Sequence, residues 1–190
     1  MGCLEPGGVV FMEVSSAEKE FAKKQVAVVT VSDRSARGER EDLSGKVAAR
    51  IARSAGWEVA HYKVIPDDKE AIKKELIRLA DEDGAALVLT TGGTGVALRD
   101  LTPEATLAVI EREVPGMAEA MRRESLKKTP HAMLSRAVCG LRRKTLIVNL
   151  PGSPRAVQEC LAVVLPALPH ALELLCGEVA DCNAVPEGSP

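Results

Sequence analysis

The feature that most constrains the fold is a nearly uninterrupted β-branched run over residues 25–32. A strand with apolar side chains on both faces is typical of a parallel sheet that helices cover on each side. Two polar residues, Ser32 and Asp33, stand at the end of this run. Because open α/β sheets bind their ligands at the carboxyl ends of the strands, we expect Ser32 and Asp33 to lie at a binding edge.

Further strands and helices alternate along the chain. Apolar runs predict strands over residues 58–65, 85–90, 137–141 and 144–150, the last two possibly antiparallel around a basic turn at 142–144. Helical spacing and breaking residues predict helices over 42–55, 68–82, 103–112, 115–128 and 154–176, the last interrupted by Pro166 and Pro169. We therefore predict one domain of the three-layer α/β/α class with a mostly parallel sheet over residues 21–177, between flexible tails at 1–20 and 178–190.

Composition excludes several classes of function. A net charge of −2 and only one Trp, one Tyr and two Phe are unlike the basic, aromatic surfaces that bind nucleic acids. The five cysteines form no Cys-x-x-Cys pair, which favours reduced thiols and a cytoplasmic location. The three histidines are far apart and are expected to be structural or exposed. No apolar run comes near the roughly 20 residues of a membrane span, so we expect no membrane partner.

A glycine-rich segment follows the strand predicted at 85–90. Thr91 leads there into Gly92, Gly93, Thr94 and Gly95. Glycines permit positive φ angles and close approach of a ligand, and backbone N–H groups at such turns bind phosphate. The segment therefore predicts a phosphate site, although an ordinary strand-to-helix turn has the same pattern. It matches neither the Gly-x-Gly-x-x-Gly fingerprint nor a P-loop, so a different phosphate-binding architecture is needed.

Two acidic residues lie beside predicted helix starts. Thr102 is the predicted N-cap of the next helix, and Glu104 lies near its positive end. Asp100 falls outside this cap and is free to hold a metal or a ligand. Asp67 precedes the helix at 68–82, where Asp67-x-x-Glu70 also fits a capping box. A purely structural role is thus the alternative for Asp67.

Several motifs follow one another in a specific order. They are Thr30-Val31-Ser32-Asp33, Ile65-Pro66-Asp67, Thr90-Thr91-Gly92-Gly93-Thr94-Gly95, Arg99-Asp100-x-Thr102-Pro103-Glu104-Ala105-Thr106, Pro115-Gly116, Met133-Leu134-Ser135-Arg136 and Asn149-Leu150-Pro151-Gly152-Ser153-Pro154. Together they resemble the molybdenum-cofactor family of MogA and MoaB proteins and of the G domains of plant Cnx and gephyrin. Each motif alone is weak, but their combination over roughly residues 25–177 is highly specific.

The resemblance implies a molybdopterin adenylyltransferase, which transfers AMP from ATP to the terminal phosphate of molybdopterin in a Mg²⁺-dependent reaction and releases pyrophosphate. It also implies a homotrimer, and a molybdenum insertase as a possible further partner. Asp67 and Asp100 would be the essential acids and the candidate Mg²⁺ ligands, because hard carboxylate oxygens suit this ion. The residues expected to bind substrate or nucleotide are Ser32, Asp33, Thr91, Gly92, Gly93, Thr94, Gly95, Thr102, Glu104, Ser135, Pro151, Gly152 and Ser153.

Two alternatives to an active enzyme stay open. A MoaB-like relative would bind molybdopterin or act as a scaffold without catalysis, and the chain lacks the insertion that some MogA members carry after the Leu-Pro-Gly motif. A fragment-like relative of a molybdenum insertase is the second alternative, against which stands the absence of an additional domain in 190 residues. Release of pyrophosphate from ATP and molybdopterin separates the enzyme from the scaffold.

Overall fold

The computed structural model describes residues 24–177. The tails predicted at 1–20 and 178–190 lie outside the described residues, as do Cys3 and Cys182. The other three cysteines, Cys139, Cys160 and Cys176, are free thiols. The description therefore concerns the predicted domain.

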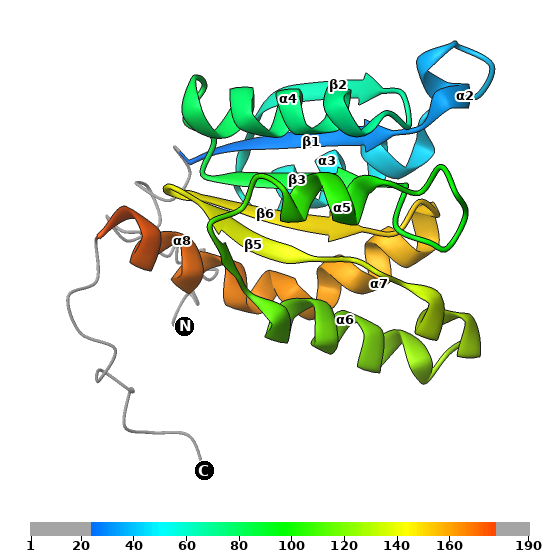
Figure 1. Cartoon of the computed structure of the whole chain (residues 1–190). Coiled ribbons are helices and arrows are strands. Elements are labelled where there is room, and N and C mark those ends of the chain that lie inside the picture. The colour runs from blue at the N-terminus through cyan, green and yellow to red at the C-terminus, as the bar shows by residue number, and fades with distance from the viewer. Residues whose placement is uncertain (1–23, 178–190) are drawn as a thin grey trace, which may run out of the picture.

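A six-stranded mixed sheet forms the middle layer (Figure 1). Its order is β2-β1-β3-β6-β5-β4. The first four of these strands are parallel. At one edge, β5 pairs antiparallel with β6, and β4 pairs antiparallel with β5. The bounds are β1 Gln25–Val31, β2 Glu58–Ile65, β3 Leu87–Thr91, β4 Arg112–Glu113, β5 Cys139–Arg142 and β6 Thr145–Leu150. The prediction of a mostly parallel sheet with an antiparallel pair around the basic turn is confirmed.

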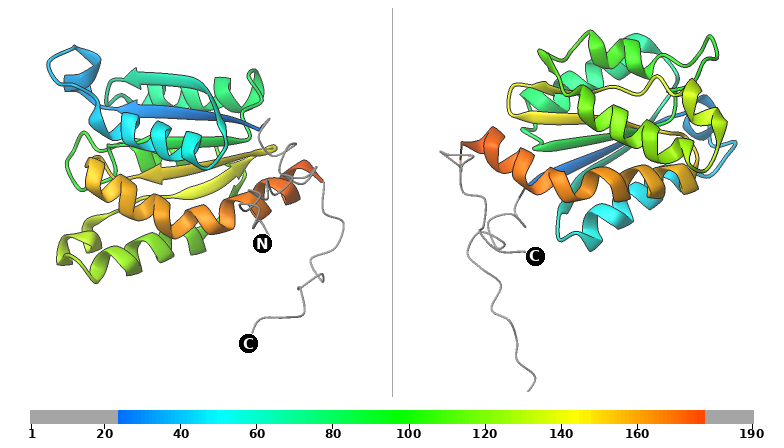
Figure 2. Two further views of the ribbon diagram at one scale, coloured as in Figure 1. Left: turned by 180° about the vertical axis from the view of Figure 1, so that it is seen from behind. Right: turned by 90° about the horizontal axis from the view of Figure 1, so that it is seen from below.

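Helices cover both faces of the sheet, because β1 alternates the direction of its apolar side chains (Figure 2). Val26 and Val28 belong to the larger core cluster, which includes α3 (Leu43–Ser54), α6 (Pro115–Leu126), α7 (Pro154–Val164) and α8 (Leu168–Cys176). Ala27 and Val29 belong to the second cluster, with α4 (Lys69–Asp81) and α5 (Thr102–Leu107). The three-layer α/β/α class is thus confirmed.

The helix starts correct two sequence predictions. The N-cap of α4 is Asp68, whose carboxylate accepts a hydrogen bond from the N–H of Ala71 at 2.8 Å. Asp67 therefore has no capping role. Thr102 does not cap α5 either, since the N-cap position is Leu101 and carries no side-chain cap bond. The prediction that Ser153 caps the closing helix is confirmed by its bond from Ala156 N–H.

The closing helical segment has the predicted bounds but is more apolar than the sequence analysis allowed. The segment Pro154–Cys176 has 23 residues, and an 18-residue window within it has a mean hydropathy of 1.6. The segment is long and apolar enough to cross a membrane by length and composition alone, so the expectation of no such run was wrong. A short 3-10 helix, η2 (Leu165–Ala167), interrupts the segment where the prolines were expected to break it. The inner face of the whole segment Pro154–Cys176, including Val157, Leu161 and Leu172, packs in the larger core cluster. We interpret it as a pair of core helices.

Candidate functional site

The carboxyl ends of β1 and β2 bring Asp33 and Asp67 into direct contact. The N–H of Asp33 donates to Oδ2 of Asp67 at 2.8 Å, and the N–H of Asp67 donates to Oδ1 of Asp33 at 3.0 Å. Asp33 begins the short helix α2 (Asp33–Ala36), whose N-cap is Ser32. The reciprocal pair fixes the position of the Asp67 carboxylate, which satisfies the first N–H of α2 and does not cap α4.

The Asp67 carboxylate lies in an environment that disfavours its charge. Burial raises the pKa of Asp67, the bond from the Asp33 N–H opposes this, and the neighbouring carboxylates of Asp33 and Asp100 raise the pKa further. The cation of Arg99 lowers it, but the net direction is upward. A bound cation would relieve such a carboxylate, because an opposite charge favours the ionised form.

The carboxylate of Asp100 lies against Gly95, the last residue of the glycine-rich segment. Its Oδ2 accepts a hydrogen bond from the N–H of Ala97 at 2.8 Å, so the carboxylate is not entirely free as expected. A Cβ added to Gly95 would lie 2.8 Å from the same oxygen, which shows how closely Asp100 approaches the backbone. Oδ1 has no hydrogen-bond partner among residues 24–177. This oxygen remains available to a ligand.

The glycine-rich segment turns sharply at two left-handed residues. Gly92 has φ +94° and Gly93 has φ +62°. The hydroxyl of Thr102 donates to the carbonyl of Gly92 at 2.9 Å, and the N–H of Thr102 donates to the carbonyl of Gly93 at 3.1 Å. Both carbonyls are thereby fixed by one buried threonine.

Fewer N–H groups of this segment are available than predicted. The N–H of Gly92 donates to the carbonyl of Leu150 at 3.2 Å, so its expected bond to phosphate is excluded. Among the residues that the structure describes, no group accepts a hydrogen bond from the N–H of Gly93, Thr94 or Gly95. We call the backbone of residues 92–95 the cradle. These three N–H groups are the part of the cradle that is available to a ligand.

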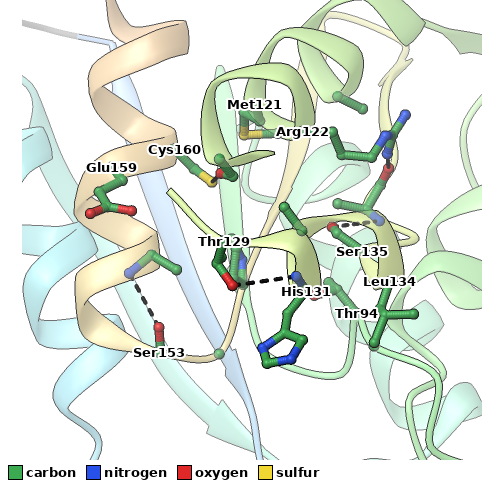
Figure 3. Close-up of a pocket in the computed structure, with 18 of the residues that line it drawn as sticks. Thr94, Met121, Arg122, Thr129, His131, Leu134, Ser135, Ser153, Glu159 and Cys160 are labelled. Carbon is green, nitrogen blue, oxygen red and sulfur yellow. Dashed lines mark hydrogen bonds between the residues drawn. The ribbon is translucent and has the colours of Figure 1, made fainter. Parts of the chain in front are cut away.

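A cavity of about 430 Å³ opens beside the cradle (Figure 3). The sequence analysis named eight of the residues that line it: Gly93, Thr94, Gly95, Asp100, Ser135, Pro151, Gly152 and Ser153. The loop at 150–153 packs tightly on the cradle, since a Cβ on Gly152 would lie 3.3 Å from the Cα of Gly92. The two glycine-containing loops therefore form one wall.

The opposite wall was missed. It comes from α6, from α7 and from the 3-10 helix η1 (Pro130–Leu134) with the residues that flank it. It consists of Ala118, Met121, Arg122, Ser125, Thr129, His131, Ala132, Leu134, Ala137, Ala156, Glu159 and Cys160. Ala118 and Met121 belong to the core as well, so their helical spacing indicated only an amphipathic helix. The available signal was Thr129, a polar residue directly before a proline, which caps η1 through a bond from His131 N–H.

Several predicted site residues do not line the cavity. Thr91 and Thr102 are fully buried, and the Thr91 hydroxyl lies 3.0 Å from that of Ser44, so both threonines support the loop from behind. Ser32, Asp33 and Asp67 lie outside the cavity at the strand ends. Glu104 forms an ion pair with Arg136. Burial opposes ionisation of Glu104, but the guanidinium holds its pKa below the ordinary value.

Comparison with known proteins identifies the family of the chain. Residues 27–170 match the family described as "Probable molybdopterin binding domain". A molybdopterin adenylyltransferase of Helicobacter pylori is 44% identical over 160 residues, which are 83% of this chain and 91% of that protein.

Solved structures of both a MoaB protein and a MogA protein, the two kinds of protein that the sequence resembles, are similar to this chain. The molybdopterin biosynthesis enzyme MoaB from Thermus thermophilus shares 52% identity with a TM-score of 0.77, covering 80% of this chain and 96% of that one. A structure of MogA shares 39% identity with a TM-score of 0.76, covering 80% and 99%. The match of the family model and the extent of these similarities show that the chain belongs to the molybdopterin-binding family of MogA and MoaB proteins.

Proposed function

We propose that this protein is a molybdopterin adenylyltransferase of molybdenum cofactor biosynthesis. It would transfer AMP from ATP to the terminal phosphate of molybdopterin and release pyrophosphate. The observation that carries the proposal is the position of Asp67 and Asp100 around one glycine-rich cradle with three available N–H groups beside a cavity. The relatives named molybdopterin adenylyltransferase support it.

The chemistry needs charge neutralisation and alignment more than covalent catalysis. An oxygen of the molybdopterin phosphate attacks the α-phosphorus of ATP, and the bond from that phosphorus to the bridging oxygen breaks as pyrophosphate leaves. The N–H groups of Gly93, Thr94 and Gly95 would hold phosphate oxygens during this exchange. Ser135, Gly152 and Ser153 would contact the pterin or the nucleotide in the cavity.

The donor set suits Mg²⁺. Among the described residues, no group of three or more His, Cys, Asp and Glu side chains could hold a metal ion. Two carboxylates with few protein ligands fit an ion that keeps several waters and binds substrate phosphates. Asp67 and Asp100 would hold it, and the ion would neutralise phosphate charge.

Three further properties belong to the proposal. We propose a homotrimer, a cytoplasmic location and a molybdenum insertase that receives the adenylylated product. The first two leave the assignment of the site unchanged. The third would explain why the product is an activated intermediate rather than a finished cofactor.

Asp100→Asn tests the function. Purified protein with ATP, molybdopterin and Mg²⁺ is assayed for pyrophosphate release, and we expect a loss of about 100-fold or more, the size seen when one group that stabilises transition-state charge is removed. Asp68→Asn is the control, because asparagine still caps α4 and the exposed side chain does not line the cavity. Turnover near the wild-type rate would remove Asp100 from the mechanism. Wild-type protein that binds molybdopterin without releasing pyrophosphate would favour the scaffold.

A further inference from the structure

The side chain of Arg136 connects the two ends of the loop that carries Asp100. Its Nε donates to the carbonyl of Gly95 at 2.6 Å, and one terminal nitrogen donates to the carbonyl of Asp100. The other terminal nitrogen pairs with the carboxylate of Glu104 on α5. One guanidinium thus joins both loop ends to a helix of the adjacent layer.

The loop between these ends has little other support. Val96 is 64% exposed and Leu98 is fully exposed, so their side chains add no core packing. Two hydrogen bonds between Ala97 and Asp100 close the turn internally but do not anchor it to the protein. Anchoring therefore depends on Arg136, whose own N–H donates to the carbonyl of Thr94 at 2.9 Å.

Arginine is needed for this geometry. The planar guanidinium presents donors in several directions at fixed angles, whereas a lysine ammonium is a compact point charge on a flexible stem. A lysine at position 136 keeps the charge beside Glu104 but cannot reach both loop carbonyls from one rigid plane. We call the hydrogen bonds from the Arg136 guanidinium to the two loop carbonyls the clamp. Arg136→Lys therefore removes the clamp but keeps the positive charge beside Glu104.

We propose that Arg136 is a positioning residue that fixes the loop at 95–100 and thereby holds the Asp100 carboxylate against Gly95. The catalytic consequence rests on the function proposed above. Arg136 touches neither reacting group in this assignment. Arg136 affects turnover because it holds the Asp100 carboxylate in position.

Arg136→Lys is the test, with two independent measurements. The first is hydrogen exchange of the Ala97 and Asp100 amides, both of which are bonded within the loop; we expect exchange at least about 10-fold faster. The second is kcat for pyrophosphate release, which should fall about 10- to 100-fold, as small displacements of catalytic groups do. The KM for molybdopterin should change little, and the Mg²⁺ concentration for half-maximal rate should rise.

Arg142→Lys is the matched control. Arg142 also makes three hydrogen bonds, two to Asp81 and one to the carbonyl of Val109, but it lies outside the cavity and the glycine-rich segment. We expect it to leave loop exchange and kcat unchanged. Glu104→Gln, a milder change at the same clamp, should accelerate loop exchange less than Arg136→Lys and also serves if the latter fails to fold.

The outcomes are distinguishable. Wild-type loop exchange in both clamp variants, or fast exchange with unchanged kcat, would overturn the positioning role. A wild-type protein without adenylylation activity would overturn the proposed function. In that case fast exchange in Arg136→Lys would still establish the clamp on Asp100.

Discussion

At position 93 a side chain has no room. Gly93 has φ +62°, and a Cβ there would lie 2.4 Å from the hydroxyl oxygen of Thr102. That hydroxyl holds the carbonyl of Gly92. The conformation of one glycine therefore determines where the cradle N–H groups lie.

We expect Gly93→Ala to reduce both stability and activity. A left-handed alanine costs about 1–2 kcal/mol, and displacing the buried Thr102 hydroxyl adds about 1–3 kcal/mol. Gly38→Ala is the control, since Gly38 has φ +74° with no atom within 4 Å and should show the backbone cost alone. Chemical denaturation and the pyrophosphate assay give the comparison. Equal losses in the two variants would contradict the tight contact at Gly93.

Asp67 makes stability depend on pH. Its pKa is raised in the folded protein by burial and by neighbouring carboxylates. The folded state is therefore disfavoured when Asp67 ionises, and this penalty is absent below the ordinary pKa of 3.8 and complete above the raised value. We expect Asp67→Asn to raise Tm at pH 7 without Mg²⁺, and the gain to vanish as the pH falls below 4. A gain that persists in acid, or a lower Tm at pH 7, would contradict this.

Between elements, the carboxylate of Asp42 joins two strands to a helix. It accepts hydrogen bonds from the hydroxyls of Thr30 on β1 and Tyr62 on β2, at 2.6 and 2.5 Å. It also caps α3 through the N–H of Gly45 at 2.9 Å. Although burial opposes its charge, these bonds hold the pKa of Asp42 below its ordinary value.

We expect Asp42→Ala to lower the free energy of unfolding by about 2–4 kcal/mol, the sum of a lost N-cap and of a buried hydroxyl without its acceptor. Asp68→Ala, which removes only the exposed cap of α4, should cost about 1 kcal/mol. Urea denaturation of both variants at pH 7 measures the difference. Equal costs would mean that the bonds from Thr30 and Tyr62 add nothing. Because the pKa of Asp42 is lowered, the stabilisation it gives should be lost as the pH falls below 3.8.

Individual strands and helix caps differ in how well the sequence predicts them. Buried strands such as β1 and β3 follow directly from their apolar runs, and Ser153 at the start of α7 is an N-cap by type and position. The cap of α4 was misplaced by one residue, because Asp67 and Asp68 are adjacent and either can cap. Only the hydrogen bond from the N–H of Asp33, which is distant in sequence, shows that Asp67 and not Asp68 belongs to the site.

Other parts of the site depend on pairing between distant segments. The helix predicted at 103–112 ends at residue 107, since the chain turns there to pair Arg112 with Leu141. The clamp by Arg136 and the cavity wall on α6 likewise depend on how these elements pack. The spacing of residues along the chain does not show how distant elements pack. The glycine-rich cradle could therefore be predicted from the sequence, and the opposite wall of the cavity could not.

At the scale of the whole molecule, the two core clusters share the strands of one sheet. Val28 and Ala27 are neighbours in β1 and belong to opposite clusters, and the same holds for Val148 and Ile147 in β6. Neither layer of helices can separate without exposing one face of these strands. The domain should therefore unfold as one cooperative unit.

Two small core substitutions test this, one on each face. Ile72→Val on α4 and Val157→Ala on α7 remove buried methyl groups from the second and the larger cluster, respectively. Ile72→Val should cost about 0.5–1.5 kcal/mol and Val157→Ala about 1–3 kcal/mol, and Tm should fall by roughly 2–4 °C per kcal/mol in a domain of this size. Since the two residues belong to different core clusters on opposite faces of the sheet, the costs should add in the double variant. Calorimetry should give a single transition in all three variants. Two separate transitions, only one of which shifts in each single variant, would show that the helical layers unfold independently and that the sheet does not couple them.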